Sequence, residues 1–140
     1  MRRHILCFLL VTSVFLSFFG CSKPAGNEIS LGQEFTLPIG QSVSVSGENM
    51  AIKFVEVVSD SRCPQGATCI WAGEASCQVE ITTSGSTYRK MLTQPGLSGP
   101  SQTDFQGYEI TFDLQPYPQV GKEIENKDCR LQLKINKKQG

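Results

Sequence analysis

Histidine is almost missing from this chain of 140 residues, and the one that is present, His4, lies close to the N-terminus. Catalytic schemes in which histidine activates a serine or a cysteine therefore have no general base in the rest of the chain. Zinc sites that include histidine are excluded for the same reason. No closely spaced pair of carboxylates offers another acid and base, so the sequence predicts a protein that is not an enzyme and holds no cofactor.

A basic patch and a long apolar segment are missing from the body of the chain. Lysine and arginine together number 13, as do aspartate and glutamate, and the two signs are scattered. Nucleic-acid binding needs clustered positive charge, so no nucleic-acid partner is expected. The only long apolar run is 5–19, and its 15 residues fall short of the roughly 20 that a transmembrane helix needs.

The N-terminus has the order of an export signal. Two arginines precede the apolar run, which is followed by Gly20 and Cys21. Basic residues, an apolar segment and a small residue in this order are typical of a secretory signal. A cysteine directly after the small residue is what a lipoprotein signal peptidase requires, because the thiol receives a diacylglycerol before cleavage. Residues 1–20 are therefore predicted to be a lipoprotein signal peptide, with Cys21 lipidated.

Two other interpretations of the leader stay open. A permanent transmembrane helix would need a longer apolar run, and an ordinary secretory signal would need an Ala-x-Ala site, which is not visible nearby. With a lipid on Cys21, the partner of the N-terminus is a bilayer. Ser22, which stands where an aspartate would favour inner-membrane retention, favours the outer membrane of a bacterial cell envelope.

Removal of the leader leaves 120 residues, with 11 basic and 13 acidic side chains and a formal charge of −2. This length fits one domain with a core of its own. The polar stretch that follows the leader contains Pro24 and Gly26, which predicts a flexible tether. The expected organisation is thus a lipidated N-terminus and tether over 21–32 and a β-sandwich domain over 33–140.

After residue 32, apolar and polar residues alternate in short runs that are separated by glycine, proline, asparagine and serine. A period of two is typical of strands with one buried face, and no amphipathic helix is visible. About seven short strands predict an all-β fold, either a single antiparallel β-sandwich of the Ig-like kind or a small barrel. The expected strands are 33–37, 41–46, 51–58, 75–83, 87–92, 108–114 and 129–135.

Besides the lipidated cysteine, the mature chain has four cysteines, and they predict two disulfides that reinforce the domain. An even number in an exported protein indicates a disulfide framework. Strand parity places Cys77 and Cys129 on buried faces, where they can tie two strands together. Cys63 and Cys69 then close the short loop between them. A zinc site made of all four is less favoured because the CxxC spacing is missing, so no metal is expected.

The segment 60–75, DSRCPQGATCIWAGEA, is the most distinctive in the chain. It resembles a signature of small, largely uncharacterised bacterial secreted proteins and lipoproteins, D-S-R-C-P-x4-C-x-W-A-G-x-A. The resemblance implies a single β-rich exported domain and brings no known activity. The matching positions are Asp60, Ser61, Arg62, Cys63, Pro64, Cys69, Trp71, Ala72, Gly73 and Ala75.

Two interpretations of this segment are open. In the structural one, Arg62 forms an ion pair with Asp60 or Glu74, and Trp71 packs on the disulfide or covers one end of the core. In the functional one, Arg62, Trp71 and Glu74 form an exposed recognition patch, because tryptophan and arginine are favoured at the centres of interfaces. Alanine substitution separates the two, since a structural loop loses melting temperature and a recognition loop loses binding.

The function favoured by these features is that of a membrane-anchored envelope lipoprotein whose non-catalytic β domain binds a protein or a glycan. One alternative starts from Ser84, Gly85 and Tyr88. They have the form S-G-x-x-Y, which looks like the loop that periplasmic lysozyme inhibitors insert into the lysozyme cleft. That alternative predicts an exposed inhibitory hairpin.

A second alternative is a carboxylate-based metal-binding module. Asp60, Glu74 and Asp104 could supply the oxygen ligands that calcium prefers. No calcium-loop spacing is present in the sequence, and scattered acidic residues usually lie on the solvated surface. This alternative therefore depends on the fold bringing the three side chains together.

Overall fold

The computed structural model describes residues 27–97 and 99–139. The predicted signal peptide, the lipid on Cys21 and the first part of the predicted tether lie outside these residues. None of the helices within the described residues is long and apolar enough to cross a membrane.

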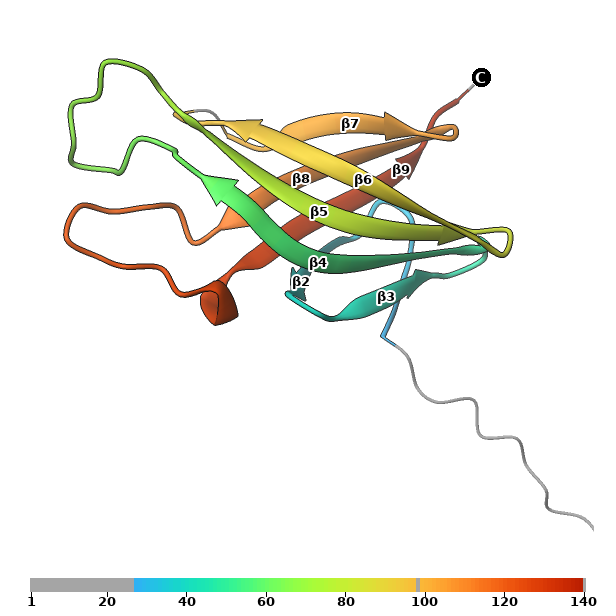
Figure 1. The fold of residues 1–140 in the computed structure, drawn as a ribbon. Helices are drawn as coiled ribbons and strands as arrows, with labels where there is room; N and C mark the ends of the chain where they lie inside the picture. The colour runs from blue at the N-terminus through green and yellow to red at the C-terminus, as the bar shows by residue number, and fades with distance from the viewer. Residues whose placement is uncertain (1–26, 98, 140) are drawn as a thin grey trace, which may run out of the picture.

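The described residues form nine strands and one short 3-10 turn. The strands are β1 (Glu28–Ile29), β2 (Glu34–Pro38), β3 (Ser42–Val45), β4 (Met50–Asp60), β5 (Glu74–Thr83), β6 (Ser86–Pro95), β7 (Ser101–Phe105), β8 (Tyr108–Gln115) and β9 (Arg130–Lys137). They build a five-stranded sheet, β1-β3-β4-β5-β6, that faces a four-stranded sheet, β2-β9-β8-β7 (Figure 1). All neighbours are antiparallel except β1, which is parallel to β3. The prediction of an all-β sandwich is confirmed.

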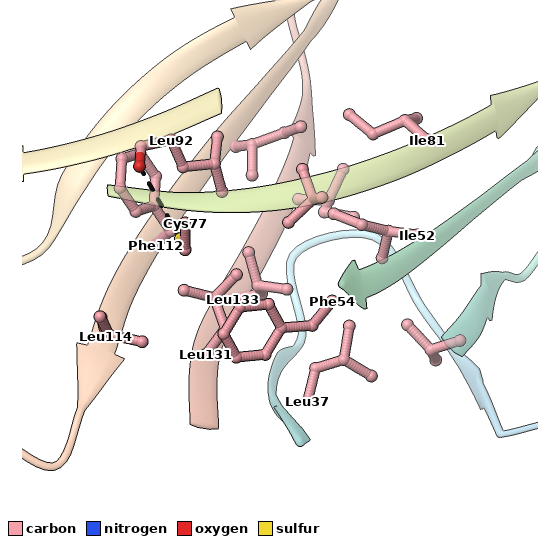
Figure 2. Packing of buried hydrophobic residues seen from close by; sticks show 14 of the residues in the cluster. Leu37, Ile52, Phe54, Cys77, Ile81, Leu92, Phe112, Leu114, Leu131 and Leu133 are labelled. Carbon is pink, nitrogen blue, oxygen red and sulfur yellow. Dashed lines mark hydrogen bonds between the residues drawn. The ribbon is translucent and has the colours of Figure 1, made fainter. Parts of the chain in front are cut away.

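The core lies between the two sheets and follows from the period-two pattern. In β5 the side chains of Ala75, Cys77, Val79 and Ile81 are buried, while the intervening residues are half-exposed. The facing strand β9 alternates in the same way. Figure 2 shows how side chains from the two sheets meet in this layer. Each fully buried aliphatic or aromatic side chain contributes about 1.5–3 kcal/mol to folding, so this layer supplies most of the driving force.

Two of the nine strands were not expected from the sequence. Strand β7 buries none of its five residues, so it has no apolar alternation to detect. Strand β1 lies inside the predicted tether 21–32, and Ile29 is buried in the core. The backbone N–H groups of Ser44 and Ser46 donate to the carbonyl oxygens of Asn27 and Ile29. The prediction that the tether extends to residue 32 is therefore wrong, because the chain is already part of the sheet at β1.

The sandwich has two ends that differ in construction. At the hairpin end, β3 and β4 are joined by a turn at 46–49, and β5 and β6 by a turn at Ser84 and Gly85. At the loop end, the connections β4–β5, β6–β7 and β8–β9 come together (Figure 1). Strand β1 pairs with the last residues of β3, so the first described residues lie nearer the hairpin end.

Candidate functional site

Three connections that are far apart in the sequence form one structural unit at the loop end. The β4–β5 connection (61–73) and the β8–β9 connection (116–129) are joined by a parallel bridge between Gln65 and Gln119. Gln65 donates its backbone N–H to the carbonyl oxygen of Pro118 at 2.9 Å and accepts the N–H of Val120 at 3.2 Å. The two longest connections are thus held side by side by backbone hydrogen bonds.

The β6–β7 connection approaches the β4–β5 connection so closely that two positions require glycine. A Cβ atom on Gly73 would lie 1.8 Å from the carbonyl oxygen of Ser61, and a Cβ on Gly96 would lie 1.9 Å from that of Ala72. The N–H of Gly96 donates to the carbonyl oxygen of Gly73 at 2.8 Å. Gly73 also has a φ of 70°, which side chains disfavour.

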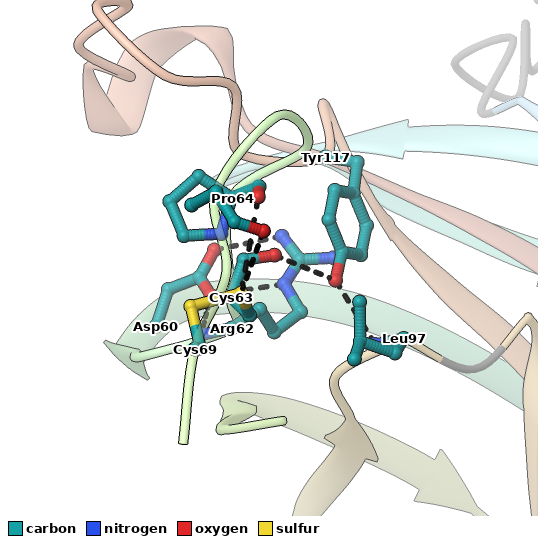
Figure 3. The surroundings of a disulfide bond; sticks show 8 residues. Asp60, Arg62, Cys63, Pro64, Cys69, Leu97 and Tyr117 are labelled. Atoms are coloured by element: carbon teal, nitrogen blue, oxygen red, sulfur yellow. Dashed lines mark hydrogen bonds and ion pairs between the residues drawn. A yellow bond between two sulfur atoms is a disulfide. The ribbon is translucent and has the colours of Figure 1, made fainter. Parts of the chain in front are cut away.

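A buried arginine locks this unit to the sandwich. The side chain of Arg62 is 0% exposed. It donates from Nε and Nη2 to the two carboxylate oxygens of Asp60, at 2.9 and 2.7 Å (Figure 3). Its Nη1 and Nη2 also donate to the carbonyl oxygens of Leu114 and Pro116, at 2.8 and 3.3 Å. The planar guanidinium therefore satisfies a carboxylate on one strand and two carbonyls at the end of β8, which a lysine cannot do.

Tyr117, in the β8–β9 connection, contacts the same guanidinium and is hydrogen-bonded to each of the other two connections. The Cζ atom of Arg62 lies 4.8 Å from the centroid of the Tyr117 ring, which is a cation–π contact. The Tyr117 hydroxyl donates to the carbonyl oxygen of Cys63 at 3.1 Å and accepts the N–H of Leu97 at 3.0 Å (Figure 3). One tyrosine thus joins the three connections.

These contacts test the two interpretations of the segment, and each is right in part. The ion pair of Arg62 with Asp60 is confirmed, and Glu74 does not take part in it. Arg62 is wrong as a member of an exposed recognition patch, because its residue exposure is 3%. Glu74 and Trp71 are exposed, as that patch requires. Trp71 is 62% exposed, so the expectation that it covers one end of the core is wrong.

The predicted disulfide between Cys63 and Cys69 is present, with an S–S distance of 2.07 Å. It closes the first half of the β4–β5 connection into a ring. Cys63 is buried next to Arg62, whereas Cys69 lies in the exposed part of the loop. The disulfide therefore ties the exposed part of the loop to the buried segment around Arg62.

The predicted disulfide between Cys77 and Cys129 is wrong, because the structure has two separate buried thiols at these positions. Parity correctly placed both side chains toward the core. It does not fix how far along its strand each cysteine lies, and the two thiols are directed at different backbone groups. Cys77 donates to the carbonyl oxygen of Leu92 at 3.8 Å (Figure 2), and Cys129 donates to that of Glu125 at 3.7 Å.

Burial makes both thiols poor nucleophiles. It raises the pKa of Cys77 from 9.0 to about 12, although the nearby charge of Arg62 opposes this shift. Burial also raises the pKa of Cys129, and the charge of Asp60 adds to that effect. The thiolate is the reactive form of cysteine, so neither side chain suits nucleophilic chemistry at neutral pH.

The loop end carries the four most exposed large apolar side chains among the described residues, which we call the apolar tip. They are Ile70 (105% exposed), Leu97 (71%), Trp71 (62%) and Val120 (59%). Each of the three connections contributes at least one of them. The contact of Ala72 with Gly96 brings Trp71 near Leu97, and the side chain of Val120 would lie 3.7 Å from a Cβ on Gly66. Only Trp71 was singled out from the sequence.

The hairpin of the lysozyme-inhibitor alternative lies at the opposite end of the sandwich. Ser84 and Gly85 have φ values of 49° and 80°, as in a two-residue type I′ turn, so the predicted exposed hairpin is confirmed. The turn is backed by 46–49, because Ser84 donates its N–H to the carbonyl oxygen of Asn49. Tyr88 lies on β6, with its ring 5.6 Å from that of Phe105. Lysozyme inhibition by this hairpin stays a prediction that an activity assay checks.

The carboxylates of the metal-binding alternative are dispersed. Both oxygens of Asp60 accept hydrogen bonds from Arg62, and Asp104 forms an ion pair with Lys138 at 2.7 Å. In the part of the chain that the structure describes, no group of three histidine, cysteine or acidic side chains could hold a metal ion. A metal site made of Asp60, Glu74 and Asp104 therefore has no geometric support.

A shallow groove of about 220 Å³ crosses the outer face of the four-stranded sheet. Its polar lining includes Glu34, Thr111, Asp113, Gln132 and Lys134. Among the described residues, no buried polar side-chain atom is left without a hydrogen-bond partner, so nothing in this groove points to a missing ligand. The apolar tip is the stronger candidate for a functional site.

Three members of the apolar tip were missed in the sequence. Leu97 and Val120 stand alone among glycine and polar residues, and Ile70 lies between Cys69 and Trp71 in a short run without alternation, so none of the three carries a periodic signal. One signal could have identified them: each lies in a turn-rich segment between two predicted strands, where an apolar side chain is not part of a buried strand face. Comparisons of the chain with protein-family models, curated proteins and solved structures found no match.

Proposed function

We propose that this protein is a non-catalytic binding domain of the bacterial cell envelope, held at a membrane by a lipid on Cys21, and that the apolar tip is the surface that binds another protein. The observation that carries the proposal is the gathering of the most exposed apolar side chains on three connections at one end. Exposed apolar clusters on a soluble domain typically mark interaction sites. Tryptophan is the residue type most enriched among the energetically dominant positions of interfaces.

The construction beneath the tip supports the same proposal. The backbone bridge at Gln65, the disulfide and the hydrogen bonds of Tyr117 hold the connections in one arrangement before any partner arrives. Binding by an already ordered surface loses less conformational entropy than binding by mobile loops. A domain that only needed to close its core could do so with shorter turns, as it does at the hairpin end.

The composition of the tip favours a protein over a glycan. The side chains of Ile70, Leu97 and Val120 have neither a donor nor an acceptor for sugar hydroxyls. Residues 63–73 contain no charged side chain. An apolar surface with one amphipathic aromatic ring is instead typical of the centre of a protein interface.

Trp71→Ala is the variant that tests the binding surface. The full-length chain is produced in its native envelope, crosslinked and purified, and the captured proteins are compared with those of the parent. We expect the variant to lose its partner while its melting temperature stays within about 2 °C, because an exposed side chain contributes little to the core. Met91→Ala is the matched control, since Met91 is 49% exposed on β6. Equal capture by Trp71→Ala and the parent contradicts the proposal.

The anchor is tested separately from the binding surface. We expect mass spectrometry of the mature protein from membranes to show a diacylglycerol adduct on Cys21. The Cys21→Ser variant should leave the membrane fraction, because the acyl chains supply the attachment. A mature chain without an adduct, or one that begins at another residue, contradicts the lipoprotein part of the proposal and leaves the binding part standing.

A further inference from the structure

The place where the chain joins the sandwich limits how the domain can sit on a membrane. Asn27 is hydrogen-bonded to the five-stranded sheet, because its carbonyl oxygen accepts the backbone N–H of Ser44 at 3.0 Å. Ser44 in turn is paired with Ala51, the second residue of β4. The chain that leads from Cys21 therefore joins the domain beside the start of β4, near the hairpin end (Figure 1).

The apolar tip lies beyond the other end of the same strand. From Ala51 to Asp60, β4 advances by nine residues, which is about 30 Å at the rise of a β-strand. The connection 61–73 continues past this point (Figure 1). Trp71 precedes Ala72, whose carbonyl oxygen accepts the N–H of Cys63 at 2.8 Å, so the tryptophan lies beyond the end of β4. The tip is therefore about 30 Å or more from the point where the chain enters the sheet.

The chain between Cys21 and Asn27 is too short to cover that distance. Six residue steps separate the two positions. A chain spans at most about 3.3–3.6 Å per residue, so these steps reach about 22 Å at most. A lipid on Cys21 thus keeps Asn27 closer to the membrane surface than Asn27 is to the tip. The domain cannot stand on the membrane with the tip downward.

The surface at the hairpin end suits contact with lipid headgroups. Its turns are 46–49, Ser84–Gly85 and Gln106–Gly107, and the last belongs to this end because Tyr108 donates a hydrogen bond to Glu48. All the residues of these turns are small or polar. Among the residues that the structure describes, no exposed large apolar side chain lies in them. Such a surface can rest on a hydrated headgroup layer without entering the hydrocarbon region.

On the basis of the proposed anchor at Cys21, we infer that the hairpin end faces the headgroup layer of the anchoring bilayer and that the apolar tip is held on the side away from it. The occupant of the tip is then neither that bilayer nor the chain 21–26, which cannot reach it. Two copies in one membrane present their tips in the same direction, so they do not meet tip to tip. The protein that binds the tip approaches from the side opposite the membrane.

Energy transfer from one tryptophan to a labelled lipid measures this orientation. The full-length lipidated protein is inserted into phosphatidylcholine vesicles that contain dansyl-labelled phosphatidylethanolamine. Trp71, the single tryptophan of the chain, reports on the tip in the parent. The Trp71→Phe, Asn49→Trp variant reports on the hairpin end, where Asn49 is exposed. We expect several-fold stronger transfer in this variant, because transfer falls steeply with distance, and a melting temperature equal to that of the parent shows that the variant is folded.

A longer tether is the control for the cause of the orientation. Insertion of about twenty glycine and serine residues after Gly26 extends the reach well beyond the distance to the tip. We expect the difference between the two reporters to shrink in this variant. With the native tether it should persist in high salt, because chain length and not charge sets the placement. Equal transfer from both reporters with the native tether would show a domain that lies on its flank, and stronger transfer from Trp71 would show contact through the tip. Either result overturns the inference.

The outcomes separate this inference from the function on which it rests. A chain without a lipid on Cys21 leaves the vesicles, as expected for Cys21→Ser, and transfer is then absent from both reporters. That result contradicts the anchor and the orientation together. Stronger transfer from the hairpin end, combined with equal partner capture by Trp71→Ala and the parent, supports the orientation and contradicts the function proposed for the tip.

Discussion

Each end of the sandwich is fastened by one cation, one carboxylate and one tyrosine, but the two groups lie in different surroundings. The groups are Arg62, Asp60 and Tyr117 at the loop end, and Lys137, Glu48 and Tyr108 at the hairpin end. The arginine side chain is 0% exposed, whereas that of the lysine is 60% exposed. The same three chemical types are therefore expected to stabilise the fold very differently, because water screens one group and not the other.

The contacts of the hairpin-end group are local to a few side chains. The Tyr108 hydroxyl donates to Oε2 of Glu48 at 2.5 Å, and Nζ of Lys137 lies 3.0 Å from Oε1 of the same carboxylate. These contacts lower the pKa of Glu48, with the hydrogen bond from Tyr108 as the largest cause and that from Lys137 next. None of the three side chains bonds to a buried carbonyl, so each can find water when the group is broken.

The loop-end group differs because backbone N–H and carbonyl groups rely on it for their hydrogen bonds. Arg62 is the hydrogen-bond donor to carbonyl oxygens at the end of β8, and Tyr117 bridges two other connections. A buried carbonyl without a donor costs about 1–3 kcal/mol, so removal of the guanidinium is felt beyond the ion pair. The comparison indicates that the buried group at the loop end orders long connections, whereas the hairpin end closes with short turns that need little support.

The largest expected effect is the loss of the buried arginine. We expect Arg62→Met to lower the free energy of unfolding by about 3 kcal/mol or more, because it leaves a partly buried carboxylate and two carbonyls without their donor. Arg62→Lys should lose most of the same stability, since an ammonium cannot replace the planar fork. Urea denaturation measures both. Lys137→Met is the hairpin-end control, and an equal loss in that variant would abolish the contrast between the two ends.

Thiol labelling measures how well the loop end is closed. With the pKa of Cys77 raised to about 12, the thiolate at pH 8 is about a thousandfold scarcer than for a thiol with a pKa of 9.0. We expect Cys77 and Cys129 to resist iodoacetamide in the folded protein and to take up two labels in urea without a reducing agent. Arg62→Lys should speed the labelling of the folded protein. Absence of label in urea would mean that the two cysteines are bridged after all.

This cysteine pair shows what strand parity could and could not establish. The period-two pattern predicted the buried face of β5 and of β9, and with it the core and the sandwich. Pairing two cysteines also requires the distance between Cys77 on β5 and Cys129 just before β9, in different sheets, which no local pattern contains. The short Cys63–Cys69 ring could be predicted because both cysteines lie in one connection.

The candidate site was only partly predictable for a similar reason. The ion pair of Arg62 with Asp60 is local, two residues apart, and was expected. The donors and acceptors that bury the arginine, such as Leu114 and Tyr117, lie more than 50 residues away and become visible only in the fold. The sequence left open whether Arg62 and Trp71 are structural or exposed. The structure buries the arginine, whose three nitrogens all have hydrogen-bond partners, and exposes the tryptophan.

Removal of the disulfide is expected to have an intermediate effect at the loop end. A ring that joins residues six apart restricts the unfolded chain enough to contribute about 2 kcal/mol. We therefore expect the Cys63→Ser, Cys69→Ser double variant to lose about that much stability. Hydrogen exchange should rise at 65–71 and stay unchanged at the hairpin Ser84–Gly85. Equal protection at 65–71 with and without the disulfide would mean that the Gln65 bridge alone orders the tip.

Acid should weaken the hairpin-end group by a small amount. The folded pKa of Glu48 lies below the ordinary value of 4.5, so its contribution is fully present above 4.5 and is lost as the pH falls through the folded pKa. We expect Glu48→Gln to be slightly less stable than the parent at pH 7 and equally stable once Glu48 is protonated in the parent. The difference should shrink in high salt, which screens exposed charges. A difference that persists in acid would assign the effect to packing.

Substitutions at backbone positions with positive φ compare the two ends directly. Ser84→Asn should raise stability by about 0.5 kcal/mol, because asparagine before glycine suits a type I′ turn better than serine. Gly85→Ala should cost about 1 kcal/mol, since a Cβ there meets nothing within 4 Å and only the φ is strained. Gly73→Ala combines the same strain with a Cβ 1.8 Å from the Ser61 oxygen, so it should cost clearly more than Gly85→Ala. Equal losses for the two alanine variants, measured by urea denaturation, would show that the loop end yields as readily as the hairpin end, and the rigid support inferred for the apolar tip would then be lost.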